Sequence, residues 1–207
     1  HPIRGKIPFE LYPFQVDTLK EVLNHKYNII LKARQLGIST LTAAYSLWLM
    51  TFRNDKNILV LATKQDTAKN LVTKIRVMHS NLPNWLKQKC IEDNKLSLRY
   101  KNGSQVKAVS SSEDSGRSEA LSLLVLDEAA FIDKIDTIWA AAQQTLSTGG
   151  QCIALSTPNG VGNWFHRTWV DAEENVNGFH PIKLHWTVHP ERDKSYRTAQ
   201  DKLLGPS

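Results

Sequence analysis

The chain has 207 residues, of which 41% are hydrophobic and 22% are charged. These fractions are typical of globular domains and exclude a disordered tail, a collagen-like fibre and a coiled-coil rod. The apolar runs are too short for a membrane span, which needs about 20 apolar residues. A net charge of +6 favours a polyanionic partner such as nucleic acid, although it does not require one. We expect one domain with a small appendage and, because the sequence does not begin with Met, a fragment of a longer protein.

The two cysteines, Cys90 and Cys152, lie far apart and form no CxxC pair. We therefore expect neither a disulfide framework nor a zinc site, and this usage fits a reducing intracellular compartment. His180, His185 and His189 form the densest group of histidines. No carboxylate or cysteine spacing around them is typical of a metal site, so we expect ordinary surface or packing histidines.

Short apolar strands alternate with amphipathic helices, a pattern that predicts an α/β domain with a mostly parallel sheet. We expect strands at residues 27–31, 58–62, 123–126, 152–155 and 181–186, and helices at about 39–49, 134–146 and 164–174. A further helix runs towards residue 78 and should be opened by a capping box at residues 63–66. Residues 96–100 and 106–108 alternate and predict a hairpin, with Asn102-Gly103 as a type I′ turn. We assign residues 1–170 to the core and 171–207 to a small lid or linker subdomain, with the first few residues as candidates to pack against the lid.

The loop after the first strand has features of a phosphate-binding loop. It reads K-A-R-Q-L-G-I-S-T over residues 32–40, against the pattern G-x-x-x-x-G-K-[ST]. Gly37 and Ser39 fit the second glycine and the Mg²⁺-binding hydroxyl, but Ile38 replaces the usual lysine. Lys32 and Arg34 are both long enough to supply the missing charge, and the sequence leaves the choice open. An ordinary strand–turn–helix is the alternative interpretation of this segment alone.

Two adjacent acids, Asp127 and Glu128, end the apolar strand at residues 123–126. Carboxylates at the end of a buried strand are costly unless cations or a ligand balance them. Asp127 is suited to hold Mg²⁺ and Glu128 to deprotonate the water that attacks a γ-phosphate. Ligands in open parallel sheets bind at the carboxyl ends of strands, where both motifs should meet.

Three weaker signals surround these motifs. Ser156-Thr157-Pro158 ends another apolar strand and could sense the γ-phosphate, although a simple turn is the plainer interpretation. Arg117 in a Ser-rich loop is a candidate arginine finger or a solvated side chain. Gln15 could hydrogen-bond an adenine, or its aromatic neighbours could simply pack under the sheet.

Together the motifs resemble the N-terminal ATPase domain of the large terminase subunit of tailed bacteriophages. The resemblance is carried, in the family's order, by L-Y-P-F-Q, K-A-R-Q-L-G-I-S-T, L-A-T-K-Q-D-T-A, S-S-S-E-D-S-G-R-S, L-V-L-D-E-A-A-F-I and S-T-P-N-G. These span about residues 9–165. Ile38 departs from many relatives, but some terminases move the lysine to the start of the loop, where Lys32 stands.

The resemblance implies a RecA-like P-loop ATPase of the ASCE type that uses ATP and Mg²⁺ to drive double-stranded DNA into a procapsid. It implies that Ser39 and Asp127 serve Mg²⁺, that Glu128 is the catalytic base, and that Arg117 enters a neighbouring subunit's site. Its further partners would be the portal protein and the small terminase subunit. We expect a homo-oligomeric ring when assembled, a monomer in isolation, no membrane, and a place in the host cytoplasm docked on the procapsid. The implied nucleotide contacts are Gln15, Lys32, Ala33, Arg34, Gln35, Leu36, Gly37, Ile38, Ser39 and Thr40, with catalysis by Glu128, Arg117, Arg34 and Lys32 and coupling by Ser156, Thr157 and Pro158.

Large terminases also carry a C-terminal nuclease domain, and no acidic cluster suited to two metals follows Glu128 in this sequence. We therefore expect ATP hydrolysis without DNA cleavage. One alternative is a superfamily 2 helicase-like ATPase. That class normally has D-E-A-D or D-E-x-H where this sequence has D-E-A-A, at residues 127–130, and it needs a second motor domain. Another is a non-hydrolysing scaffold whose loop has decayed at Ile38, and the retained Glu128 argues against it.

Overall fold

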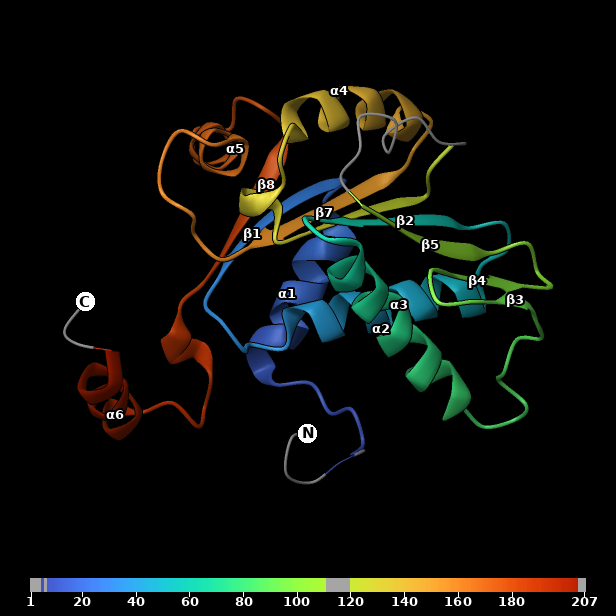
Figure 1. Ribbon diagram of the computed structural model, residues 1–207, viewed down its shortest axis with the longest axis horizontal. Coiled ribbons are helices and arrows are strands. Elements are labelled where there is room, and N and C mark those ends of the chain that lie inside the picture. Colours follow the sequence, from blue (N-terminus) through green and yellow to red (C-terminus); the bar gives the residue numbers. More distant parts are fainter. Residues whose placement is uncertain (1–4, 6, 111–119, 205–207) are drawn as a thin grey trace.

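An eight-stranded sheet between two layers of helices forms the centre of the molecule (Figure 1). The computed structural model describes residue 5, residues 7–110 and residues 120–204. The strand order is β3-β4-β5-β2-β6-β7-β1-β8, and every pair is parallel except β3 with β4 and β4 with β5. This confirms the predicted α/β fold. The strands are β1 (Tyr27–Lys32), β2 (Asn57–Ala62), β3 (Cys90–Asp93), β4 (Ser97–Tyr100), β5 (Gln105–Ser110), β6 (Leu123–Asp127), β7 (Gln151–Ser156) and β8 (Phe179–Leu184).

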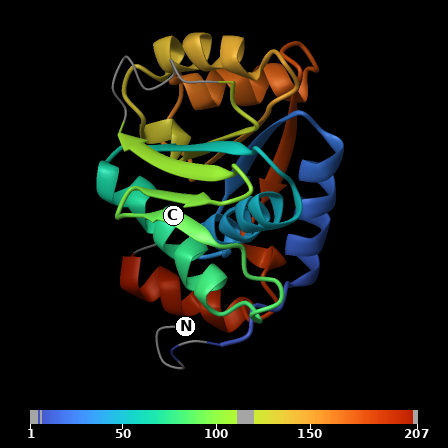
Figure 2. The same ribbon diagram turned by 90° about the vertical axis from the view of Figure 1, so that its right-hand side faces the viewer.

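The helices cover both faces of this sheet. Helices α1 (Pro13–Asn24), α2 (Ile38–Phe52) and α3 (Gln65–Ser80) lie on one face, and α4 (Ile135–Leu146) and α5 (Trp164–Glu173) lie on the other (Figures 1 and 2). Helix α6 (Lys194–Leu204) lies away from the sheet, on the side of α1 (Figure 1). Two short 3₁₀ helices, η2 (Ala129–Phe131) and η3 (Trp186–Val188), follow β6 and β8. No helix within the described ranges has the length and hydropathy to cross a bilayer.

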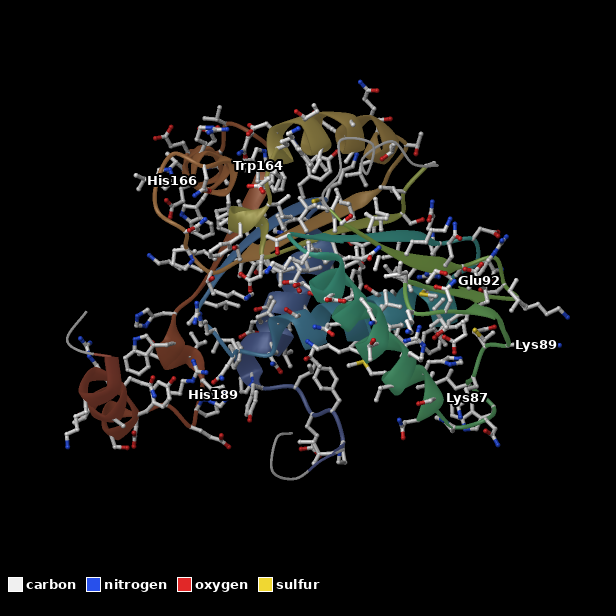
Figure 3. All side chains as sticks on the ribbon, viewed as in Figure 1. Lys87, Lys89, Glu92, Trp164, His166 and His189 are labelled. Atoms are coloured by element: carbon white, nitrogen blue, oxygen red, sulfur yellow. The ribbon has the colours of Figure 1, made fainter. Side chains whose placement is uncertain are left out.

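Each face of the sheet has its own apolar core. Ile30 and Val60 belong to the core beneath α1–α3, whereas their neighbours Ile29 and Leu59 belong to the core beneath α4 and α5. Successive side chains of a strand point to opposite faces, so strands covered on both sides appear in the sequence as continuous apolar runs. Trp164 lies between α5 and α4 (Figure 3) and closes the second core.

Several local predictions need correction. No helix was predicted before β1, yet α1 occupies residues 13–24. The predicted capping box is wrong, because α3 has Lys64 as its N-cap without a side-chain cap. The predicted hairpin is confirmed by the antiparallel pairing of β4 and β5. Its turn is not type I′, which requires positive φ at both central residues, because Gly103 has φ +84° and Asn102 is not among the residues with positive φ.

The assignment of residues 171–207 to a lid stays a prediction. Within this range, β8 extends the central sheet by pairing with β1, and α6 lies apart from the sheet (Figure 1). His189 lies between them, near the N-terminal end of α1 (Figure 3). There its ring centroid is 4.8 Å from that of Tyr12. The segment after β8 therefore contacts the start of the chain's first helix.

Candidate nucleotide site

Three polar strand ends meet at one edge of the parallel sheet. Lys32 ends β1, Asp127 ends β6 and Ser156 ends β7. Strand β7 lies between β1 and β6, with Leu31 opposite Ser156 and Asp127 opposite Leu155. The predicted loop and the predicted acidic pair are therefore separated by a single strand, and their side chains reach each other across its end.

The loop after β1 turns through two left-handed residues before α2 begins. Gln35 has φ +59° and Gly37, the N-cap of α2, has φ +73°. A Cβ atom at position 37 would lie 2.7 Å from Nε2 of Gln15, so both the backbone conformation and the space require glycine. Helix α2 has no side-chain cap, which leaves its first-turn N–H groups suited to an anion.

Ile38 does not face this loop. The residue is 2% exposed and belongs to the core beneath α1–α3. Leu36 is buried in the same core. The apolar residue at the usual lysine position therefore packs α2 against the sheet.

Lys32 and Glu128 form an ion pair at the centre of the site. The Lys32 ammonium lies 2.9 Å from Oε1 of Glu128, and only 8% of the lysine side chain is exposed. The other carboxylate oxygen of Glu128 accepts hydrogen bonds from the N–H and the hydroxyl of Thr157, both at 3.3 Å, and one from Ser156 at 3.5 Å. Glu128 itself has φ +54°, a conformation uncommon for a residue with a side chain and enriched at functional sites. One carboxylate thus connects the ends of β1, β6 and β7.

Asp127 is placed differently from its neighbour. It is 6% exposed, and its Oδ1 accepts a hydrogen bond of 3.3 Å from the hydroxyl of Ser39, at the start of α2. Burial raises the pKa of Asp127, and the charge of Glu128 raises it further against the opposing effect of Lys32. Burial acts in the same direction on Glu128, but the hydrogen bond and charge of Lys32 outweigh it and lower that pKa. The two adjacent acids therefore have pKa values shifted in opposite directions.

Gln15 lies behind the loop with both ends of its amide engaged. Its oxygen accepts from the backbone N–H of Tyr12 and its nitrogen donates to the carbonyl of Leu36, at 3.1 and 2.9 Å. Gln15 is 3% exposed, and it fixes α1 to the loop. The adenine contact expected for it stays a prediction.

Arg34 is exposed. The backbone carbonyls of Arg34 and Gln35 accept hydrogen bonds of 3.0 and 3.3 Å from the guanidinium of Arg192, in the segment before α6. The segment after β8 therefore makes two contacts: Arg192 binds the loop, and His189 packs at the start of α1.

A family model for the N-terminal part of the T4-like-virus type of terminase large subunit matches residues 29–203. The chain belongs to the large terminase family. The match covers β1 from residue 29 onward, all of β2 to β8, and every predicted site residue except Gln15.

Solved large terminases share this fold. The large terminase ATPase domain of Thermus phage P74-26 superposes with a TM-score of 0.74 at 21% identity, covering 96% of this chain and 90% of that one. A large terminase from a thermophilic bacteriophage gives 0.73 at 14% identity, covering 94% and 50%. That of bacteriophage HK97 gives 0.72 at 19% identity, covering 96% and 44%. The chain thus spans about half the length of the latter two proteins.

The structure brings together most of the site that the sequence indicated for a large terminase. Lys32, Ser39, Asp127, Glu128, Ser156 and Thr157 converge, as described. The backbone N–H of Ala33 donates a hydrogen bond to the carbonyl of Leu184, and that of Thr40 donates one to the carbonyl of Gly37. Pro158 is exposed just after the end of β7. Arg117 lies outside the described residues.

Lys74 of α3 is a charged group near this site that the motifs did not single out. Burial lowers its pKa, while the charge of Asp127 raises it and that of Lys32 lowers it again. Lys74 thus shares the electrostatic environment of the acidic pair. A lysine in the middle of a polar helix carries no sequence signal of this kind, because most such residues lie on a solvated face.

Proposed function

We propose that this chain hydrolyses ATP with Mg²⁺ at the edge formed by β1, β6 and β7. The observation that supports this most is Glu128, whose carboxylate is held by Lys32 on one side and by Thr157 on the other. A base positioned from three strands beside an uncapped helix N-terminus is the arrangement that phosphoryl transfer to water needs. Relatives support it too, since the large terminase of the thermophilic bacteriophage has been solved with ADP and with ATP-gamma-S.

The residues present fit a magnesium ion. Ser39 and Asp127 offer a hydroxyl and a carboxylate oxygen 3.3 Å apart, and Mg²⁺ is bound by one or two such oxygens together with phosphates and waters. The raised pKa of Asp127 reflects a buried carboxylate that a cation would stabilise in its charged form. When bound, Mg²⁺ would neutralise charge that develops on the phosphate oxygens.

Lys32 serves two anions in turn. Its ammonium cannot hold Glu128 at 2.9 Å and a γ-phosphate oxygen with the same strength at once. When nucleotide enters, Lys32 turns toward the phosphate, and Glu128 loses the charge partner that lowers its pKa. Glu128 then becomes a stronger base at the moment when it must accept a proton from the attacking water. Arg34, which is exposed, is the less favoured candidate for this contact.

Ser156 and Thr157 link the state of Glu128 to the rest of the sheet. Ser156 also accepts a hydrogen bond from the N–H of Ala130, and Asn159 donates to the carbonyl of Ala130. A movement of the Glu128 carboxylate therefore changes contacts on both β7 and η2. We assign to this connection the coupling of hydrolysis to movement.

As part of a large terminase, the domain would drive double-stranded DNA into a procapsid. The net charge of +6 suits a DNA phosphate backbone, and family membership supports the portal protein, the procapsid and the small terminase subunit as partners. Assembly as a homo-oligomeric ring in the host cytoplasm, with Arg117 acting in a neighbouring subunit, belongs to the same proposal. If Arg117 acts in this way, specific ATPase activity should rise with protein concentration.

The test compares three proteins in steady-state ATP hydrolysis and in binding of a slowly hydrolysed ATP analogue. Glu128→Gln keeps the shape of the side chain and should lower turnover at least about 100-fold, the scale of lost general-base catalysis, while Mg²⁺-dependent binding persists. Asp133→Asn removes a nearby exposed acid and should behave as wild type. Equal turnover in all three proteins would refute the proposal and favour a scaffold.

A further inference from the structure

A second cluster of metal-ligand side chains lies at the opposite end of the sheet from the nucleotide site. Glu21, His25 and His180 each offer a ligand atom, and these atoms all lie within 4.8 Å of one another. In the described part of the chain this is the one group of three or more such residues that could hold an ion. His180 is paired with Asn28 in the β1–β8 register, four residues before Lys32. At about 3.3 Å per residue, the cluster is about 13 Å from the ion pair of the nucleotide site.

We propose that Glu21, His25 and His180 form a binding site for Zn²⁺ or a similar transition-metal ion. Two imidazoles and one carboxylate are a ligand set that Zn²⁺ accepts, with a fourth position left for water. Ligand atoms on a tetrahedral Zn²⁺ lie about 3.3 Å apart, given bond lengths of about 2.0–2.1 Å. In the structure, Oε2 of Glu21 is 2.9 Å from Nε2 of His180, and each of the three residues offers a ligand atom within 4.8 Å of the others.

The positions of these side chains are set by contacts around them. Glu21 and His25 are four residues apart at the end of α1, which places them on the same side of the helix. The carbonyl of His25 accepts hydrogen bonds from Asn28 at 2.9 Å and from Gln151 at 3.0 Å, so its backbone is fixed to β1 and β7. The backbone of His180 is fixed by the pairing of β8 with β1. With these backbones held in place, binding requires rotation of the side chains alone.

The hydrogen bond of the His25 ring determines which of its nitrogens is available as a ligand. Its Nδ1 lies 2.9 Å from the backbone carbonyl of Glu21, a bond in which the ring nitrogen donates, and this leaves the lone pair on Nε2. Metal-bound histidines commonly donate their other ring N–H to a carbonyl in this way. The rings of His25 and His180 are stacked with centroids 3.7 Å apart and planes 4° apart. Because the lone pair of an imidazole nitrogen lies in the plane of its ring, one of these two rings would rotate about its side-chain torsions to bring both nitrogens to the same ion.

The consequence for the fold is a cross-link between α1 and β8. Strand β8 is at the edge of the sheet and pairs with β1 on one side. It leads directly into the segment whose His189 and Arg192 contact Tyr12 and the phosphate loop. A metal ion at this cluster would hold β8 and α1 together and thereby stabilise the attachment of that segment. His180 was expected to be an ordinary histidine because its ligand partners lie far earlier in the sequence, at positions 21 and 25.

The test is metal titration of the chelator-treated chain, followed by thermal unfolding and by the visible absorption of bound Co²⁺. At ZnCl₂ 100-fold above its Kd, the midpoint of unfolding should rise by about 5–10 °C for a domain of this size. Glu21→Gln and His180→Gln should each weaken Zn²⁺ binding by at least about 10-fold, since loss of a ligand costs no less than loss of its outer partner. His166→Ala, which removes a histidine of α5 (Figure 3), should leave the affinity unchanged.

Two further measurements separate this site from the nucleotide site. Asp127→Asn should retain the Zn²⁺ affinity and the Co²⁺ spectrum, and MgCl₂ should not displace Co²⁺, because Mg²⁺ prefers oxygen ligands. No midpoint shift with ZnCl₂ in the wild-type chain would overturn the proposal. So would a shift that persists in both Glu21→Gln and His180→Gln, or one that only Asp127→Asn abolishes.

Discussion

Replacing Lys32 by methionine removes one charge from the nucleotide site while keeping most of the volume of the side chain. At an effective dielectric constant of about 20, charges 2.9 Å apart attract by about 6 kcal/mol, and desolvation offsets much of this. The Glu128 side chain is 31% exposed, so water takes up part of its charge when the lysine is lost. We expect Lys32→Met to lower the free energy of unfolding by about 1–3 kcal/mol at neutral pH.

The effect on catalysis should be larger than the effect on stability. Removing one preorganised group that stabilises developing charge costs about 2.7–4 kcal/mol, or 10²–10³ in kcat. The assay is steady-state ATP hydrolysis, with chemical denaturation of the same samples to show that they are folded. Arg34→Met is the matched control, because it removes a charge from the same loop at an exposed position and should have the smaller effect. Turnover unchanged in Lys32→Met but lost in Arg34→Met would refute the assignment.

The pH dependence of stability gives a second check on the same pair. The folded-state pKa of Glu128 lies below its ordinary value of 4.5, so the unfolded chain binds more protons than the folded one in this range. The stabilisation from Glu128 is therefore present above pH 4.5 and is lost as the pH falls through the lower, folded-state value. In Lys32→Met this acid-induced loss should be smaller. An identical acid limb in both proteins would contradict the ion pair.

Three other predictions concern packing and burial. Gly37→Ala should lower the free energy of unfolding by about 2 kcal/mol, because of φ strain and the displaced Gln15 amide. Gly160→Ala, at φ +68° in open space, is the control and should show the strain alone, about 1 kcal/mol. Both are measured from the denaturant midpoint. Ile38→Lys should destabilise the domain by about 3 kcal/mol or more, because it places a charge in the core. In the double variant with Lys32→Met, it should also fail to restore turnover, which would support Lys32 as the cation of the loop. Cys152 is fully buried, which raises the pKa of its thiol, so a thiol reagent should label Cys90 in the folded chain and Cys152 only after unfolding.

The sequence predicted the strands well because those of the parallel sheet are covered on both faces. Helix α1 was missed because its buried positions include Gln15 and Thr18, so the apolar period that marks a helix is weak. Gln15 is buried because its side chain donates a hydrogen bond to the carbonyl of Leu36 in the loop after β1, a partner 21 residues away that no local pattern reveals. Strand β3 was missed because most of it is exposed, and pairing with β4 is what defines it.

The candidate site was likewise predicted only in part from the sequence. The motifs located Lys32, Ser39, Asp127 and Glu128, since each stands at or soon after the end of a strand that is easy to recognise. They could not show that Lys32 contacts Glu128, 96 residues later, because this depends on β7 lying between β1 and β6.

The position of Lys32 also explains why an apolar residue is tolerated at position 38. A lysine in the first turn of α2 would be carried by the helix, whereas Lys32 is carried by β1 and is held by an acid on a neighbouring strand. With the cation on the sheet, position 38 is free to pack into the core, where Ile38 is 2% exposed. Lys32, the proposed phosphate-binding residue, is thereby in direct contact with Glu128, the proposed base. In this chain, therefore, binding of the γ-phosphate and activation of Glu128 would be two consequences of one movement of Lys32.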